Sequence, residues 1–157
     1  MSTFIIMGYF SLRSGRRVRT EVRTNGTSKV VYHMHYDTSV DCSQSGPFSA
    51  ELRKYSPPHD TVLQDDTIAS VIAKAYIPPG NVPGSIILEA IRMAPVPVKS
   101  GYMDPESEFR YPTVFAHGTV TGEHEGGQGG EVMFPMTTSN YVRGSTKQTT
   151  LACVLRF

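Results

Sequence analysis

Apolar and polar residues alternate with a period of two along much of this chain, and this pattern constrains its fold more than any other feature. In "RRVRTEVR" (residues 16–23), Val18, Thr20 and Val22 face one way and the charged residues face the other. The segment "KVVYHMHYD" (residues 29–37) alternates in the same way, and "TNGT" between the two is typical of a hairpin turn. Because successive side chains of a strand point to opposite faces, the pattern predicts a pair of antiparallel strands.

Similar segments recur along the chain, separated by turns rich in Gly, Pro, Asn and Asp. The segment "TIASVIAKAY" is ambiguous, because its apolar residues have helical spacing whereas its β-branched residues and the Pro-Pro-Gly stop favour a strand. We expect a strand there, although residues 60–76 taken alone allow either structure. A turn is expected at "RSG" (residues 13–15), and loop or irregular backbone over residues 41–66. Further strands are expected at residues 3–12, 84–97, 113–122, 131–144 and 146–157.

Eight or nine short strands in 157 residues predict an all-β chain with a single domain over residues 1–157. We expect an antiparallel β-barrel of the OB-like type, with a jelly roll or sandwich as the second choice. A chain of this length buries roughly two thirds of its unfolded surface, so it needs neither a metal nor a disulfide to fold. Cys42 and Cys153 form no disulfide framework, and their roles stay open.

Positive charge is concentrated at the N-terminal end of a chain whose formal net charge is only +1. Of the 15 basic and 14 acidic residues, six basic residues and one acidic residue lie within residues 1–36. This asymmetry predicts either one electropositive face, or a solvated strand whose cations pair with acids elsewhere in the fold.

The register of the predicted hairpin decides where these cations lie. Requiring both strands to bury the same side predicts a three-residue loop at residues 25–27. The outer face then collects cations and imidazoles, and the aligned pairs are Arg17 with His35, Arg19 with His33, and Arg23 with Lys29. Like charges opposite one another are destabilising, so this face calls for an anion, an acidic neighbour or water.

A cationic track with flat side chains beside it is what a single-strand binder requires. We therefore predict a non-enzymatic binding module for single-stranded nucleic acid, or for another anionic ligand, with no cofactor and no catalytic residue. Against this hypothesis, the chain lacks Trp, and Tyr32 and Tyr36 fall on the expected core face. The predicted contact residues are Arg17, Arg19, Arg23, Lys29, His33 and His35.

Two alternatives remain open. His33 and His35 occupy alternate positions of one strand and could reach one metal ion, as in cupin-type jelly rolls, but residues 38–40 supply no acidic third ligand. A self-associating or partner-binding β-module is the runner-up to nucleic-acid binding, because the apolar "FIIMGYF" needs a partner strand within the chain or across a homodimer.

The N-terminal apolar run precedes its positive charges, which is the reverse of a secretory signal, and no segment reaches the ~20 apolar residues of a membrane span. We therefore expect a cytoplasmic or nuclear protein with reduced thiols that is neither secreted nor bound to a membrane.

Four segments carry a family resemblance: "DDTIASVIAKAYIPPG", "SIILEAIRM", "TVFAHGTVTG" and "SNYVRG". Over about residues 60–157 they resemble small, uncharacterised all-β proteins predicted in mushroom-forming fungi, which look like variants of the OB-fold barrel. The resemblance implies an OB-like barrel, and such barrels commonly bind oligonucleotides or oligosaccharides on one face. These segments are strand and turn patterns, so the resemblance assigns no site residue.

Overall fold

The computed structural model of the chain describes residues 2–24, 27–41, 46–79, 86–97, 111–122, 125–126 and 131–156. These residues form strands and turns without any helix, which confirms the all-β prediction; there is accordingly no helix among them that could cross a membrane. The strands are β1 (Thr3–Thr24), β2 (Thr27–Val40), β3 (Phe48–Tyr55), β4 (Thr67–Tyr76), β5 (Ile86–Pro95), β6 (Thr113–His117), β7 (Thr119–Val120), β8 (Glu125–Gly126), β9 (Glu131–Val142) and β10 (Ser145–Arg156).

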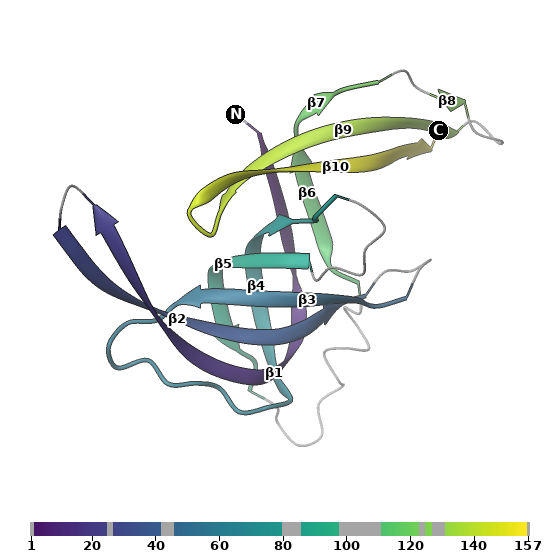
Figure 1. Cartoon of the computed structure of the whole chain (residues 1–157). Coiled ribbons are helices and arrows are strands. Elements are labelled where there is room, and N and C mark those ends of the chain that lie inside the picture. Colours follow the sequence, from purple (N-terminus) through teal and green to yellow (C-terminus); the bar gives the residue numbers. More distant parts are fainter. Residues whose placement is uncertain are drawn as a thin grey trace.

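Five strands close into a barrel in the order β1-β2-β3-β5-β4, because β1 pairs with β2 on one side and with β4 on the other (Figure 1). The pairings are antiparallel except for β3 with β5, which run parallel. A five-stranded Greek-key barrel is the OB-like architecture that the strand pattern predicts, rather than a jelly roll. The strand prediction for residues 67–76 is confirmed by β4.

Alternate residues of the barrel strands fill its interior. In the first half of β1 the even-numbered side chains point inward. The buried side chains of β2, β3 and β5 are also even-numbered, and those of β4 are odd-numbered. The buried apolar core consists of Phe4, Ile6, Phe10, Leu12, Met34, Tyr36, Val40, Ala50, Leu52, Ala69, Val71, Ala73, Ala75, Ile86 and Leu88.

Three expectations about strand boundaries are wrong. The backbone stays extended through "RSG", so β1 is one strand of 22 residues. Residues 48–55, expected as loop and irregular backbone, form β3, which the barrel needs between β2 and β5. The expected strand over 113–122 divides at Gly118, where a Cβ would collide with the carbonyl oxygen of Thr137. The close approach of Thr137 therefore requires glycine there, where the chain passes from β6 to β7 in a second sheet.

The N-terminal apolar strand finds its partners within the chain. Residues 5–12 of β1 pair with β4, and residues 3–7 pair with β6 on the opposite side. Of the two kinds of partner expected for this segment, within the chain or across a homodimer, the structure shows partners within the chain. Among the described strands of this sheet, β6 is the one at the edge.

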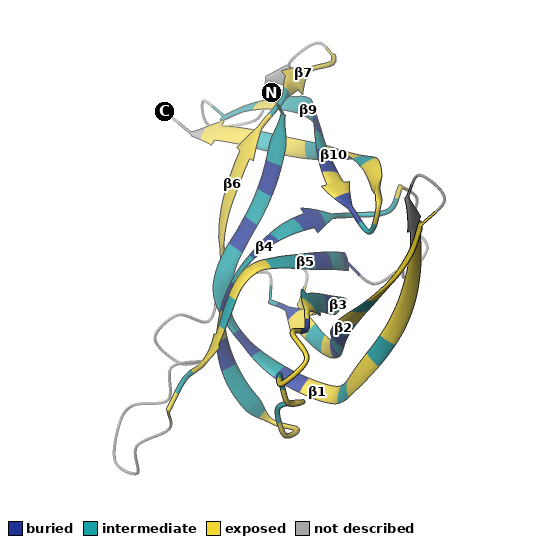
Figure 2. Ribbon diagram, turned by 90° about the vertical axis from the view of Figure 1, so that its left-hand side faces the viewer, coloured by how far each residue is buried: buried dark blue, intermediate teal, exposed yellow. Residues whose placement is uncertain are grey.

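The hairpin of β9 and β10, with β7 and β8 beside β9, lies across one end of the barrel (Figures 1 and 2). Asn140 anchors it there: the side-chain oxygen accepts from the backbone N–H of Phe4 at 3.3 Å and from the Thr3 hydroxyl at 3.1 Å. The side-chain amide donates to the carbonyl oxygens of Phe4 and Ala75, which belong to the paired strands β1 and β4. Asn140 is buried, so these bonds have no competition from water.

We predict that Asn140→Ala lowers the free energy of unfolding by at least about 1–3 kcal/mol, because buried polar groups of β1 and β4 lose their partner. Urea denaturation measures this loss. The control is Gln148→Ala, at an exposed position on β10, which should leave stability nearly unchanged. Equal stability of the two variants would contradict the anchoring role of Asn140.

Candidate nucleic-acid interface

The β1–β2 hairpin extends beyond the barrel as a two-stranded ribbon, and most of the described residues in this projecting part are exposed (Figure 2). Its register differs by one residue from the predicted register: Arg17 pairs with Met34, Arg19 with Tyr32, and Val18 with His33. Since Thr24 pairs with Thr27, the loop has two residues rather than three. The prediction that Arg17 and Arg19 share one face with His33 and His35 is therefore wrong.

A bulge in β1 explains this outcome. Arg13 pairs with Asp37 and Arg16 with His35, so Ser14 and Gly15 together lie opposite the single residue Tyr36. Ser14 has a positive φ of 52°, as the irregular backbone of a bulge often requires. One extra residue reverses which side chains face inward, so the odd-numbered residues of β1 beyond the bulge share the inner side with Tyr36.

We call the side of the hairpin that continues the barrel interior the inner face; it carries Arg17, Arg19, Glu21, Ser28, Val30 and Tyr32. The Arg17 guanidinium lies over the Tyr32 ring, 4.5 Å from its centroid. Arg17 Nη2 also donates to the carbonyl oxygens of Pro57 and Pro58, at 3.0 and 3.4 Å. These contacts hold a planar cation and an aromatic ring in fixed positions on an exposed ribbon.

Arg19 lies beside this pair, opposite Tyr32, and is exposed. Among the residues that the structure describes, no acid forms an ion pair with it. Glu21, the one acid of this face, accepts a hydrogen bond from the Ser28 hydroxyl. The inner face thus has an exposed cation, a second cation held against a tyrosine, and one acid nearer the tip.

The outer face of the hairpin and of β3 has a different electrostatic character. His35 Nδ1 lies 2.5 Å from Glu51 Oε1 and donates to it, since an ionised carboxylate can only accept. Arg143, from the β9–β10 turn, places Nη2 2.9 Å from Glu51 Oε2, in an ion pair without an aligned hydrogen bond. Arg16 lies 3.6 Å from Glu51 and 3.3 Å from Asp37. The Nδ1 of His35 is therefore occupied by Glu51 rather than open to an anion.

His33 also lies on the outer face, where its ring meets the Tyr55 ring edge-to-face at a centroid distance of 6.3 Å. Burial, and then the nearby Arg53, lower the pKa of His33 below its ordinary value. The imidazole is therefore neutral near pH 7 and supplies no charge for a phosphate.

The other predicted contact residues are Lys29 and Arg23. Lys29 is exposed on the outer face, opposite Val22. The backbone of Arg23 pairs with that of Ser28, but the side chain of Arg23 lies outside the described part of the structure. Arg13, elsewhere in the basic N-terminal end, pairs with Asp66 at 3.1 Å. Pairing with acids elsewhere in the fold is thus found for Arg13 and Arg16, whereas Arg19 and Lys29 are exposed on opposite faces of the hairpin.

The metal alternative gains no support from the described residues, because no group of three or more His, Cys, Asp or Glu side chains among them is placed to hold an ion. His33 and His35 share a face as predicted, but His35 is bonded to Glu51 and Arg53 lies near His33. Cys153 is a partly buried free thiol, and Cys42 lies outside the described residues.

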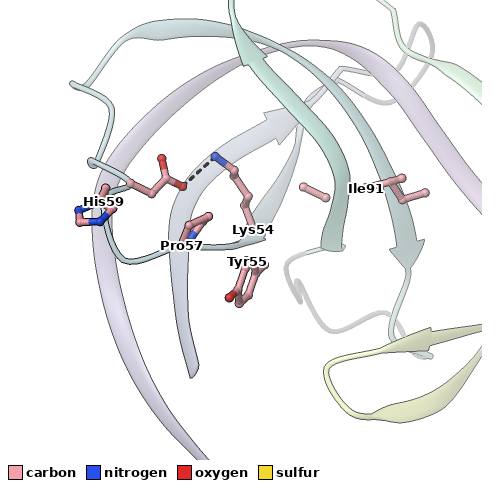
Figure 3. Close-up of a pocket in the computed structure, with 7 residues that line it drawn as sticks. Lys54, Tyr55, Pro57, His59 and Ile91 are labelled. Carbon is pink, nitrogen blue, oxygen red and sulfur yellow. Dashed lines mark hydrogen bonds and ion pairs between the residues drawn. The ribbon is translucent and has the colours of Figure 1, made fainter. Parts of the chain in front are cut away.

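A pocket of about 470 Å³ opens beside the hairpin, where β3 and β5 diverge (Figure 3). We call it the β3–β5 pocket. It was not predicted, because the lining residues from β3 and from the connector between β3 and β4 (residues 56–66) were expected to be loop or irregular backbone. The alternation of "AELRKY", with Ala50 and Leu52 apolar, was the available signal. The lining residues are Lys54, Tyr55, Pro57, His59, Asp60, Ala90 and Ile91.

Comparison with known proteins identifies no family. No family model matches the chain, and no curated protein matches it. Among solved structures, the chain is similar to a deletion mutant of the single-stranded DNA binding protein from Thermus aquaticus, with a TM-score of 0.49 and 10% sequence identity. The match covers 98% of this chain and 75% of that chain. A likeness this distant carries no argument, so the OB-like description rests on the strand order.

We predict that acid destabilises the protein partly through Glu51. Burial alone would raise the pKa of Glu51, but the hydrogen bond from His35 and the positive charge of Arg143 outweigh it and hold that pKa below its usual value. The unfolded state therefore binds a proton more readily, and stability falls as the pH drops through the unfolded and then the native pKa of Glu51. His33 acts in the same direction, because its native pKa is also lowered.

Urea denaturation at pH 7 and pH 4 tests this prediction. Glu51→Gln should cost about 1.5–3 kcal/mol at pH 7, the range for hydrogen bonds to charged groups. It should then lose less further stability than the wild type on going to pH 4. Asp65→Asn, at an exposed turn position, should retain the wild-type pH dependence. A wild-type pH dependence in Glu51→Gln would contradict the assignment.

Proposed function

We propose that the protein is a non-enzymatic binding module for single-stranded nucleic acid, and that the strand lies along the inner face of the β1–β2 hairpin. The observation that carries the proposal is the exposed group of Arg17, Arg19 and Tyr32 on one side of a projecting ribbon. Cations that follow a phosphate backbone, beside flat groups on which bases stack, are the requirements for single-strand binding.

The barrel type supports this proposal. OB-fold barrels bind oligonucleotides with the face of strands 2 and 3 and with the loops that follow strands 1 and 4. The hairpin of β1 and β2 occupies the position of the loop that follows strand 1. Because the fold alone hosts many functions, the argument depends on the side chains of the inner face.

The position of each side chain revises the set of contact residues. Arg17 and Arg19 remain in it, and Tyr32 joins them. Lys29, His33 and His35 leave the principal contact surface, because they lie on the opposite side of the ribbon. An intracellular location and a relationship to fungal proteins remain predictions.

We predict that a labelled single-stranded DNA oligonucleotide binds with an affinity that falls steeply as salt rises, because bound cations release counterions. Arg19→Ala should weaken binding and reduce the slope of log affinity against log salt by about 0.7, the value for one phosphate contact on a single strand. Fluorescence anisotropy over a series of salt concentrations measures both quantities.

Lys29→Ala is the matched control, since it removes an exposed cation from the opposite face of the same hairpin. It should leave the slope near the wild-type value. If Lys29→Ala weakened binding more than Arg19→Ala, the nucleic acid would lie on the outer face instead. Absence of binding at low salt by correctly folded protein would reject the proposed function.

Self-association is the second candidate, and we propose β6 as the strand that mediates it. All five residues of β6 are exposed at the edge of the described sheet, including Val114 and Phe115. An apolar edge strand can pair with the same strand of a second copy.

We predict that the mass measured by sedimentation rises with protein concentration. A Val114→Lys, Phe115→Lys double variant should stay monomeric, because charges on an edge strand oppose pairing. A wild-type protein that is monomeric at every concentration would reject this candidate.

A further inference from the structure

We infer that the β3–β5 pocket receives one nucleobase of the strand whose phosphates contact the hairpin; this inference rests on the proposed function. The pocket has a clear structural origin. β3 and β5 pair only as far as Arg53 and Glu89, whose side chains form an ion pair at 2.7 Å. Beyond this pair the two strands separate, and the gap between them is open to solvent.

Apolar and aromatic side chains from different elements line the pocket, among them Tyr55 from β3 and Ile91 from β5. In β5, Ala90 pairs with Ala73 and Arg92 with Ile72, so Ile91 is the extra residue of a bulge. Ile91 and Tyr55 are each 57% exposed, although both border a concavity. Apolar and aromatic walls with a few polar groups are typical of a ligand site, and an aromatic side chain in such a wall can stack with a planar ring.

Polar groups at one side of the pocket complement the edge of a base. Lys54 Nζ lies 2.9 Å from Asp60 Oδ2, and both side chains are partly buried (Figure 3). His59 lies on the same connector as Asp60. An ammonium group and a carboxylate side by side offer a donor and an acceptor, which is the combination that base edges present.

The position of Arg17 favours a nucleotide over an uncharged ring compound. Arg17 Nη2 donates to the carbonyl oxygen of Pro57 at 3.0 Å, and Pro57 also lines the pocket. The guanidinium therefore lies close to the pocket rim while its other side faces the inner face of the hairpin. A phosphate bound at Arg17 would lie near Pro57 at the rim of the pocket, and the attached base would pass from the inner face to Tyr55, which contacts His33 on the outer face.

Tyr55 variants test the assignment with a single-stranded DNA oligonucleotide that contains 2-aminopurine, whose fluorescence falls on stacking. Tyr55→Ala should weaken binding about 5- to 150-fold, the equivalent of one aromatic–base stack. It should also reduce the quenching of 2-aminopurine, but leave the salt slope unchanged because no phosphate contact is lost. Tyr55→Phe should restore both affinity and quenching.

Ile91→Ala removes the apolar lining that β5 contributes and should weaken binding in the same way, which keeps the test valid if Tyr55→Ala is poorly folded. Tyr141→Ala is the matched control, because Tyr141 is 62% exposed on β9 and is not among the residues that line the pocket. If Tyr55→Ala and Ile91→Ala bound like Tyr141→Ala while the wild type bound with a steep salt dependence, the pocket assignment would be overturned and the proposed function would stand. A wild type that does not bind would reject both.

Discussion

The bulge at Ser14 and Gly15 is the constraint on which the proposed binding surface depends. Through it, one strand of 22 residues pairs with β4 inside the barrel and continues with β2 as the projecting hairpin. The site favours glycine, because a Cβ at position 15 would lie 2.9 Å from Tyr36 Cε1. The Tyr36 hydroxyl in turn accepts the backbone N–H of Leu63 at 3.1 Å, which fixes the connector between β3 and β4.

That connector links the bulge to the candidate site. It begins directly after β3 and presents the carbonyl oxygens of Pro57 and Pro58 to Arg17. The backbone N–H of Ser56 donates to the carbonyl oxygen of Tyr32 at 2.9 Å, so the same segment also holds β2. The orientation of Arg17 over Tyr32 is thus a consequence of how the connector closes this end of the barrel, and the pocket beside it has the same cause.

Ion pairing, rather than net charge, distinguishes the two faces of the hairpin. On the outer face Glu51 gathers Arg16, His35 and Arg143, so three basic side chains share one carboxylate at the junction of β2, β3 and the second sheet. Partly buried charges of this kind serve the assembly of the fold, since each would be costly to leave unpaired. On the inner face Arg19 remains exposed. A surface with few internal pairs is the one from which a polyanion can displace counterions.

Part of the candidate site could be predicted from the sequence. The charge asymmetry and the alternation identified the hairpin, with Arg17 and Arg19 on it. Tyr32 was assigned to the core face, which is the correct side of β2, but the ribbon leaves the barrel there and the ring is 36% exposed. The predicted register relied on both strands burying one apolar side. That criterion fails at Val22 and Val30, which are exposed on opposite sides of a ribbon that covers no core.

The sequence by itself determined the all-β class, most of the strands and the position of the hairpin, because alternation and turn residues act within a few positions of the chain. The tertiary structure alone decided which side chains share a face. Which side chains of β1 point to the inner side beyond residue 13 depends on the bulge. The bulge packs against Tyr36 and Val62, which are distant in sequence. Tyr55 and Ile91 line one pocket because the barrel pairs β3 with β5, which are distant in sequence, and this pairing ends at Arg53 and Glu89, just before the two residues.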